Sequence, residues 1–148
     1  MADTDLIKLY SGRILELASD MPLTERLQSP DATVKKRSPL CGSTVTVDVI
    51  VSEGRVSAFG QDVKACALGQ ASASILGRVV IGRSLEELKA ARDALKSMLN
   101  GGPVPDAPFD GYEVLVPARD FRNRHASIML ALDATVAATE EALRADCA

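Results

Sequence analysis

Two cysteines, Cys41 and Cys66, are the side chains of this sequence most able to do chemistry. Each lies among small residues at the edge of a predicted regular element. The two predicted strands between them form a hairpin, so the two thiols can return to the same place. A thiolate is both a metal ligand and a nucleophile, and the sequence therefore suggests a thiolate site. The alternative is that each cysteine is a small buried apolar residue, and their spacing matches no Cys-x-x-Cys zinc motif.

The position of Cys66 favours the charged form of its thiol. Cys66 opens a predicted helix, where free backbone N–H groups and the helix dipole stabilise a negative charge. Cys41 lies at a turn between Pro39 and Gly42, just before a strand. Cys147, next to the C-terminus, has no such setting, and we interpret it as a frayed surface thiol.

His125 is the single histidine and thus the single imidazole ligand that the chain offers. Two sulfurs and one imidazole would suit zinc or an iron–sulfur cluster with one imidazole ligand. The alternative is a surface histidine near a helix start. The nearby Arg119, Arg122 and Arg124 could favour thiolates or dock an acidic partner, or could form a solvated flank. No nucleophile elbow or phosphate-binding glycine motif is present, so we do not expect an enzyme.

Composition and charge exclude several classes of protein. With 47% hydrophobic and 25% charged residues, the sequence is typical of a folded protein. A net charge of −3 argues against nucleic-acid binding. No apolar run approaches the roughly 18 residues of a membrane span, and the acidic N-terminus lacks the apolar core of a signal peptide. We therefore expect a cytoplasmic protein with no nucleic-acid or membrane partner.

Periodicity predicts a helix followed by three strands in the first half of the chain. The helix is expected over residues 4–19, and the strands over 32–37, 44–51 and 55–63. A bulge is expected around Phe59 and Gly60. The charged run Lys35, Lys36 and Arg37 is typical of an edge strand, with a binding role as the alternative.

The second half predicts three helices. The first begins at Cys66 and stops at Gly82. The second covers residues 85–99 behind a capping box of Ser84 and Glu87, and the last runs from about Pro117 to about Ala145. The stretch from about 100 to 116 is expected to be an irregular Gly- and Pro-rich insertion. The predicted fold is a single α+β domain over residues 1–148, a three-stranded antiparallel sheet with helices packed on one face and a long C-terminal helix.

Several motifs together resemble the U-type iron–sulfur cluster assembly scaffolds, the IscU/SufU group and the N-terminal domain of nitrogenase-type scaffolds. They are Ser-Pro-Leu-Cys-Gly at 38–42, Lys-Ala-Cys-Ala at 64–67 with Ala-Ser-Ala-Ser at 71–74, and Gly-Arg-Ser-Leu-Glu-Glu-Leu at 82–88. The insertion before Val116-Pro117-Ala118-Arg119 resembles the SufU branch.

The resemblance implies a site of three cysteines and an aspartate that binds zinc or a nascent [2Fe–2S] cluster. Cys41 and Cys66 match the first two cysteines. Ser43 replaces the aspartate, and His125 aligns with the third cysteine. Asp120, in a segment slightly longer than usual, is a weaker candidate for an oxygen ligand. An imidazole cannot carry a persulfide, so sulfur acceptance would fall on Cys41 or Cys66.

The expected function is a scaffold or sulfur acceptor in iron–sulfur cluster assembly. Cys41, Cys66 and His125 would bind iron and sulfide, or Zn²⁺, and pass sulfur or a transient [2Fe–2S] cluster onward. A cysteine desulfurase would be the sulfur donor, and apo-proteins or a cluster carrier would be the recipients. One alternative is a zinc-binding sulfur-relay partner of a desulfurase that builds no cluster. The other is a diverged interaction module without a working site.

Overall fold

The computed structural model describes residues 12–39 and 42–147, except for the side chains of 146 and 147. Cys41 and the first part of the predicted N-terminal helix therefore lie outside the described residues. The elements in chain order are α2 (Gly12–Ser19), β1 (Ala32–Arg37), β2 (Thr44–Ser52), β3 (Arg55–Lys64), α3 (Ala67–Gly77), α4 (Leu85–Leu99), the 3₁₀ helices η1 (Phe109–Asp120) and η2 (Arg122–Arg124), and α5 (His125–Cys147).

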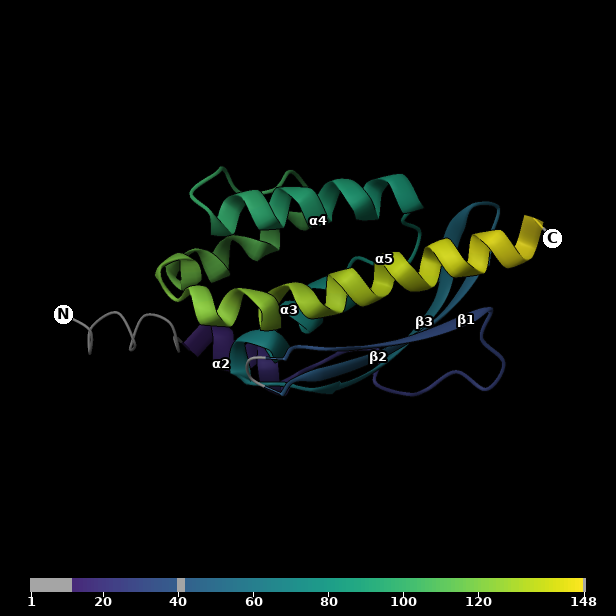
Figure 1. Ribbon diagram of the computed structural model, residues 1–148, viewed down its shortest axis with the longest axis horizontal. Coiled ribbons are helices and arrows are strands. Elements are labelled where there is room, and N and C mark those ends of the chain that lie inside the picture. The colour runs from purple at the N-terminus through teal and green to yellow at the C-terminus, as the bar shows by residue number, and fades with distance from the viewer. Residues whose placement is uncertain (1–11, 40–41, 148) are drawn as a thin grey trace.

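The predicted α+β fold is confirmed. The three strands form an antiparallel sheet in the order β1-β2-β3. Figure 1 shows α5 lying along one face of this sheet and α4 lying above α5. Val45, Val47 and Val49 alternate along β2 and are fully buried, because alternate side chains of a strand point to the same face. Apolar side chains of α5, such as Ile128 and Leu132, complete the core.

The edge-strand prediction is confirmed, whereas the predicted bulge is displaced. Lys35, Lys36 and Arg37 are exposed on β1, which forms one edge of the sheet. The pairing of β2 with β3 shifts between Ile50 and Val51, not at Phe59 and Gly60. Gly60 is needed for another reason, because a Cβ there would clash with the backbone carbonyl of Glu25.

The second face of the sheet is covered by the segment between α2 and β1. Asp48, on the face of β2 opposite to the valines, is fully buried. Its carboxylate accepts hydrogen bonds from Arg26 (Nε, 2.6 Å), from the Leu27 N–H (3.0 Å) and from the Thr33 hydroxyl (2.6 Å). These hydrogen bonds therefore attach the segment before β1 to β2, the central strand of the sheet.

The start of the last helix is later than predicted. Pro117 lies inside η1, and α5 begins at His125. The insertion is also more regular than expected, since residues 109–120 form a 3₁₀ helix. The predicted capping box is confirmed, with Glu87 N–H bonded to the Ser84 hydroxyl and Ser84 N–H to the Glu87 carboxylate.

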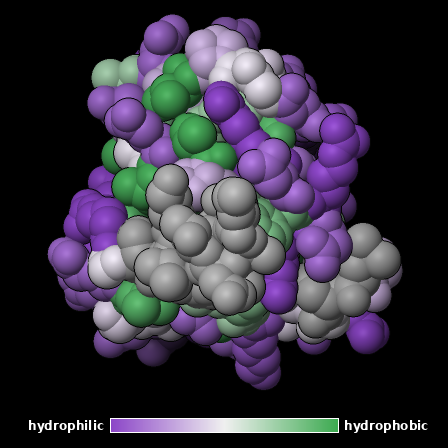
Figure 2. All heavy atoms as spheres, turned by 90° about the vertical axis from the view of Figure 1, so that its left-hand side faces the viewer, coloured by the Kyte–Doolittle hydropathy of each residue, from purple (hydrophilic) through white to green (hydrophobic). Residues whose placement is uncertain are grey.

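The surface is mainly polar with scattered apolar side chains. Figure 2 looks at the end of the molecule that carries α2 and shows green apolar atoms among purple polar ones. Among the described residues, the exposed large apolar side chains are Leu15, Leu23 and Ile81. None of the helices within residues 12–39 and 42–147 has both the length and the apolar character needed to cross a membrane.

Replacing Asp48 by alanine should destabilise the protein. The substitution leaves the Leu27 N–H and the Thr33 hydroxyl without their acceptor, and the free energy of unfolding should fall by roughly 3 kcal/mol. Urea unfolding followed by circular dichroism measures this change. Asp62→Ala, at an exposed position on β3, is the control and should change stability by less than about 0.5 kcal/mol.

The Asp48 effect should also depend on pH. Burial alone would raise the pKa of Asp48, but hydrogen bonds from Arg26, Thr33 and the Leu27 N–H hold it below its ordinary value of 3.8. A depressed folded-state pKa contributes stability above the unfolded pKa, and this contribution is lost as pH falls through the folded pKa. The stabilities of the wild type and Asp48→Ala should therefore converge in acid. A constant difference down to the acid limit would contradict this assignment.

Candidate functional site

Cys66 is the N-cap residue of α3. Its backbone is extended (φ −66°, ψ 171°), so it joins the end of β3 to the first turn of the helix. Its side chain forms no capping hydrogen bond. The backbone N–H groups of Leu68 and Gly69 nevertheless stabilise a negative charge on its sulfur. The side chain is half-buried. The prediction that Cys66 opens a helix is confirmed.

Two buried serines, Ser127 and Ser43, lie one after the other next to this sulfur. The Ser127 hydroxyl of α5 lies 3.5 Å from the Cys66 Sγ, and the Ser43 hydroxyl lies 3.2 Å from that of Ser127. Ser43 and Ser127 are 4% and 2% exposed. A thiolate can only accept a hydrogen bond, so Ser127 donates when Cys66 is charged and is then free to accept from Ser43.

Gly69 makes the approach of Ser127 possible. A Cβ at position 69 would lie 2.6 Å from the Ser127 Oγ and 2.8 Å from the Ala65 Cβ, which are distances that real Cβ atoms do not show. The first turn of α3 therefore accepts the α5 hydroxyl only with glycine at this position.

The described residues on either side of positions 40 and 41 are bonded to each other close to Ser127. Ser38 N–H donates to the Ser43 carbonyl (2.8 Å), and Gly42 N–H donates to the Ser38 carbonyl (2.9 Å). Gly42 has φ +70°, which favours glycine. In the hairpin, Thr44 pairs with Lys64, so the predicted pairing of the two strands is confirmed, and the return of the Cys41 thiol to Cys66 stays a prediction.

The surroundings of Cys66 favour its thiolate. Burial would raise the pKa of the thiol, but the Gly69 N–H, the Ser127 hydroxyl, the Leu68 N–H and the charge of Arg124 together hold it below its ordinary value of 9.0. Such a thiol is charged in a larger fraction of molecules near neutral pH and is more available as a nucleophile or ligand.

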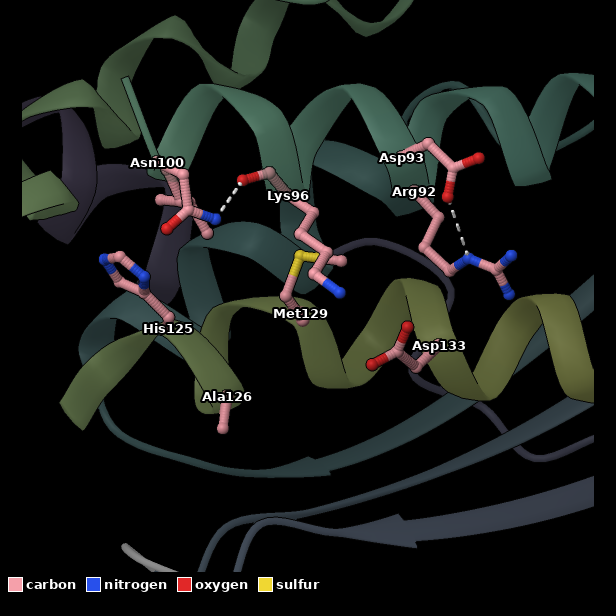
Figure 3. A pocket seen from close by; sticks show the side chains of 9 residues that line it. Arg92, Asp93, Lys96, Asn100, His125, Ala126, Met129 and Asp133 are labelled. Carbon is pink, nitrogen blue, oxygen red and sulfur yellow. Dashed lines mark hydrogen bonds and ion pairs between the residues drawn. The ribbon is translucent and has the colours of Figure 1, made fainter. Parts of the chain in front are cut away.

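His125 points away from Cys66. Its Nε2 lies 3.1 Å from the backbone carbonyls of both Ala118 and Arg119. Figure 3 shows the ring directed toward the end of α4 and Asn100, on the opposite side of α5 from the sheet. Residues two apart on a helix point about 200° apart. Because Ser127 faces Cys66, His125 faces elsewhere.

The hydrogen bonds of His125 show which ring nitrogen is left to bind a ligand. Two carbonyl oxygens are acceptors, so Nε2 carries a proton, and in the neutral ring Nδ1 has the lone pair. Metal-bound histidines commonly donate their second N–H to a backbone carbonyl in this way. For Nδ1 to reach Cys66, however, the side chain must turn and lose both bonds. Its role as a ligand therefore stays a prediction.

Similarity to known proteins decides the family. Residues 9–118 match the family described as NifU-like N-terminal domain. The chain belongs to this family. A crystal structure of a NifU-like N-terminal protein from Brucella abortus is 43% identical, covers 95% of this chain and 98% of its own, and superposes with a TM-score of 0.91.

More distant relatives carry scaffold names. Two archaeal proteins from Archaeoglobus fulgidus, named iron–sulfur cluster assembly scaffold protein IscU 1 and IscU 2, are 25% identical over 96 residues, 64% of this chain. The match spans only 63% of their own length. The protein named IscU from Thermotoga maritima is 22% identical over 83% of this chain and 87% of its own length.

The SufU branch is supported by fold alone. The crystal structure of a candidate SUF-system scaffold from Fervidobacterium islandicum has a TM-score of 0.81, and it covers 90% of this chain and 98% of its own. At 15% identity it shows the same fold and does not assign the branch.

Of the other residues predicted for the site of this NifU-like domain, Arg124 is close enough for its charge to act on Cys66, whereas Asp120 and Arg119 have other surroundings. Asp120 is exposed at the end of η1. Arg119 donates instead to the carbonyls of Met98 and Gly102. Cys41 and the side chain of Cys147 lie outside the described residues. Within the described ranges no three His, Cys, Asp or Glu side chains form a group able to hold a metal ion.

Sequence reasoning missed Ser127. Its hydroxyl lies 3.5 Å from the Cys66 sulfur, and no motif in the sequence marks it. The signal available in the sequence was the helical spacing. Residues two apart on a helix point in nearly opposite directions, so His125 and Ser127 cannot both face Cys66.

Ser127→Ala should raise the pH midpoint for alkylation of Cys66, because the thiolate loses its hydroxyl donor. The sign follows from the lowered pKa, since removing a stabiliser of the charged form raises it. The measurement is the rate of iodoacetamide labelling of the Cys66 peptide against pH, read by mass spectrometry. Ser57→Ala is the control, because Ser57 is an exposed serine on β3 whose hydroxyl donates to the Ile50 carbonyl, at the end of the hairpin away from Cys66. Equal midpoints in Ser127→Ala and the wild type would contradict the assignment.

Proposed function

We propose that this NifU-like domain is a scaffold that accepts sulfur and assembles a transient iron–sulfur cluster for transfer to other proteins. The observation that carries the proposal is Cys66, a half-buried thiol at a helix N-terminus whose pKa is lowered by its neighbours. Membership of the family and the scaffold names of the relatives support the same role.

The sulfur step follows from the thiolate. The Cys66 sulfur attacks the terminal sulfur of a persulfide on a donor protein, of which a cysteine desulfurase is the expected class. A new S–S bond forms on Cys66, the S–S bond of the donor breaks, and the donor leaves as a thiolate. The attack needs a charged and accessible sulfur, and the N–H groups at the start of α3 stabilise that charge.

Iron and sulfide are the cargo, and the proposed protein ligands are Cys41, Cys66 and His125. Cys41 lies between Ser38 and Ser43, whose backbones are bonded to each other beside Ser127. In this proposal His125 joins the cargo only after its ring has left the Ala118 and Arg119 carbonyls. Recipient apo-proteins or a cluster carrier then take the product.

Anaerobic incubation with iron, cysteine and a desulfurase should give a sulfide-to-metal absorption band in the wild type. Cys66→Ser should abolish the band, because a hydroxyl replaces the thiolate. His125→Ala should reduce the amount of cluster and its lifetime if the imidazole is the third ligand. Sulfide and iron analysis on the same samples checks the stoichiometry, and Ser57→Ala, at an exposed position on β3, serves as the folded control.

Each outcome separates the scaffold from its alternatives. A wild type that stays colourless but binds zinc through Cys66 would indicate a zinc-dependent sulfur relay. If Cys41→Ser with Cys66→Ser keeps wild-type activity toward a desulfurase, the domain is an interaction module. A His125→Ala protein that matches the wild type would remove His125 from the ligand set and leave the scaffold role intact.

A further inference from the structure

A groove runs along the outward face of α5, between α4 and β1. Two hollows form it, one of about 600 Å³ on the side of α4 and one of about 400 Å³ on the side of β1. They share Arg92, Ala126 and Asp133. We call this feature the α5 groove, with the stretch of α5 from Ala126 to Glu140 as its floor. Figure 1 shows α5 between α4 and the strands.

The floor of the α5 groove is built for contact with another chain. Its lining includes Ala126, Leu130 and Ala137, which recur four and seven residues apart along one face of the helix, with Met129 beside Leu130. At about 1.5 Å per residue, the floor is roughly 20 Å long. That length matches about six residues of extended chain.

Cations line both walls. Arg92 and Lys96 come from α4, and Lys36 and Arg37 come from β1. Among residues 12–39 and 42–147, Lys36, Arg37 and Lys96 have no ion-pair partner. Arg92 meets only the adjacent Asp93, at 3.6 Å. These positive charges therefore remain available to a ligand.

The carboxylates of the groove do not neutralise its walls. Asp133, in the floor, feels the charges of Arg92, Lys36 and Lys96 but forms no ion pair with them within the described residues. Figure 3 shows the Lys96 and Asp133 side chains extending into the space between α4 and α5. Glu140 lines the far end of the groove. The lining of the groove thus carries the four cations Lys36, Arg37, Arg92 and Lys96 against the three carboxylates Asp93, Asp133 and Glu140, on a chain whose net charge is −3.

We propose that the α5 groove binds an acidic segment of a partner protein. Apolar side chains of the segment pack on the floor, and its carboxylates meet the two cationic walls, which is the charge complementarity that steers and orients protein association. The groove reaches Ala126, which precedes the Ser127 that contacts Cys66, and Ser38, whose N–H bonds the carbonyl of the Ser43 that contacts Ser127. The inference deepens the proposed function, on which it rests only for the role of the partner, because the bound segment would bring that partner next to the thiol.

The test uses the full chain and a fluorescein-labelled peptide of roughly ten residues, long enough to span the groove, in which leucines alternate with pairs of glutamates. Binding is measured by fluorescence anisotropy in about 50 mM and about 300 mM salt, where screening differs strongly. Lys36→Glu and Lys96→Glu should each weaken binding by about threefold or more. Asp133→Asn should strengthen it, because a like charge leaves the floor.

Lys64→Glu is the matched control, since it makes the same charge change at an exposed site on β3, away from the groove. It should leave binding close to that of the wild type. The proposal is overturned if Lys64→Glu weakens binding as much as the groove variants, if a peptide with glutamine in place of glutamate binds equally well, or if Asp133→Asn weakens binding. Binding needs neither metal nor sulfide, so its failure is separate from a failure of cluster assembly.

Discussion

The close approach of α3 to α5 is the constraint on which the arrangement of the site depends. Gly69 leaves room for the Ser127 hydroxyl, and one turn later the Ser72 hydroxyl donates to the Ile128 carbonyl at 2.6 Å. These contacts fix both the distance between the helices and the rotation of α5 about its axis. With that rotation fixed, Ser127 meets Cys66, and His125 must point toward α4.

Much of the fold could be predicted because its signals are local. Alternation along β2 and the Ser84–Glu87 capping box each depend on neighbouring residues, and both are present as expected. The start of α5 depends on more distant contacts. A proline is tolerated at the first turn of a helix, which made Pro117 a reasonable start, but the Ala118 and Arg119 carbonyls are held by His125. The burial of Asp48 likewise comes from Arg26 and Leu27, which no periodic pattern connects to it.

The site was only half predictable for the same reason. Cys66 at a helix start is a feature of local sequence, and its stabilised thiolate follows from backbone geometry that any such helix has. The neighbours of its sulfur come from three segments far apart in the chain, and only the tertiary structure brings Ser43 and Ser127 to it. The resemblance aligned His125 with a ligand position, whereas its ring here points toward the end of α4 (Figure 3), so its role as a ligand stays a prediction.

Ser43 stands where the family resemblance implies an aspartate, and a hydroxyl at this place differs from a carboxylate in its charge and in its hydrogen bonding. A carboxylate beside Ser127 would accept the proton of that hydroxyl and repel a thiolate, whereas the Ser43 hydroxyl can donate and leaves Ser127 free to face the sulfur. Ala126 and Ser127 are consecutive on α5, one lining the groove and the other contacting Cys66. A segment bound in the groove would therefore lie within one helical turn of the thiol, and the first turn of α5 would link partner binding to thiol chemistry.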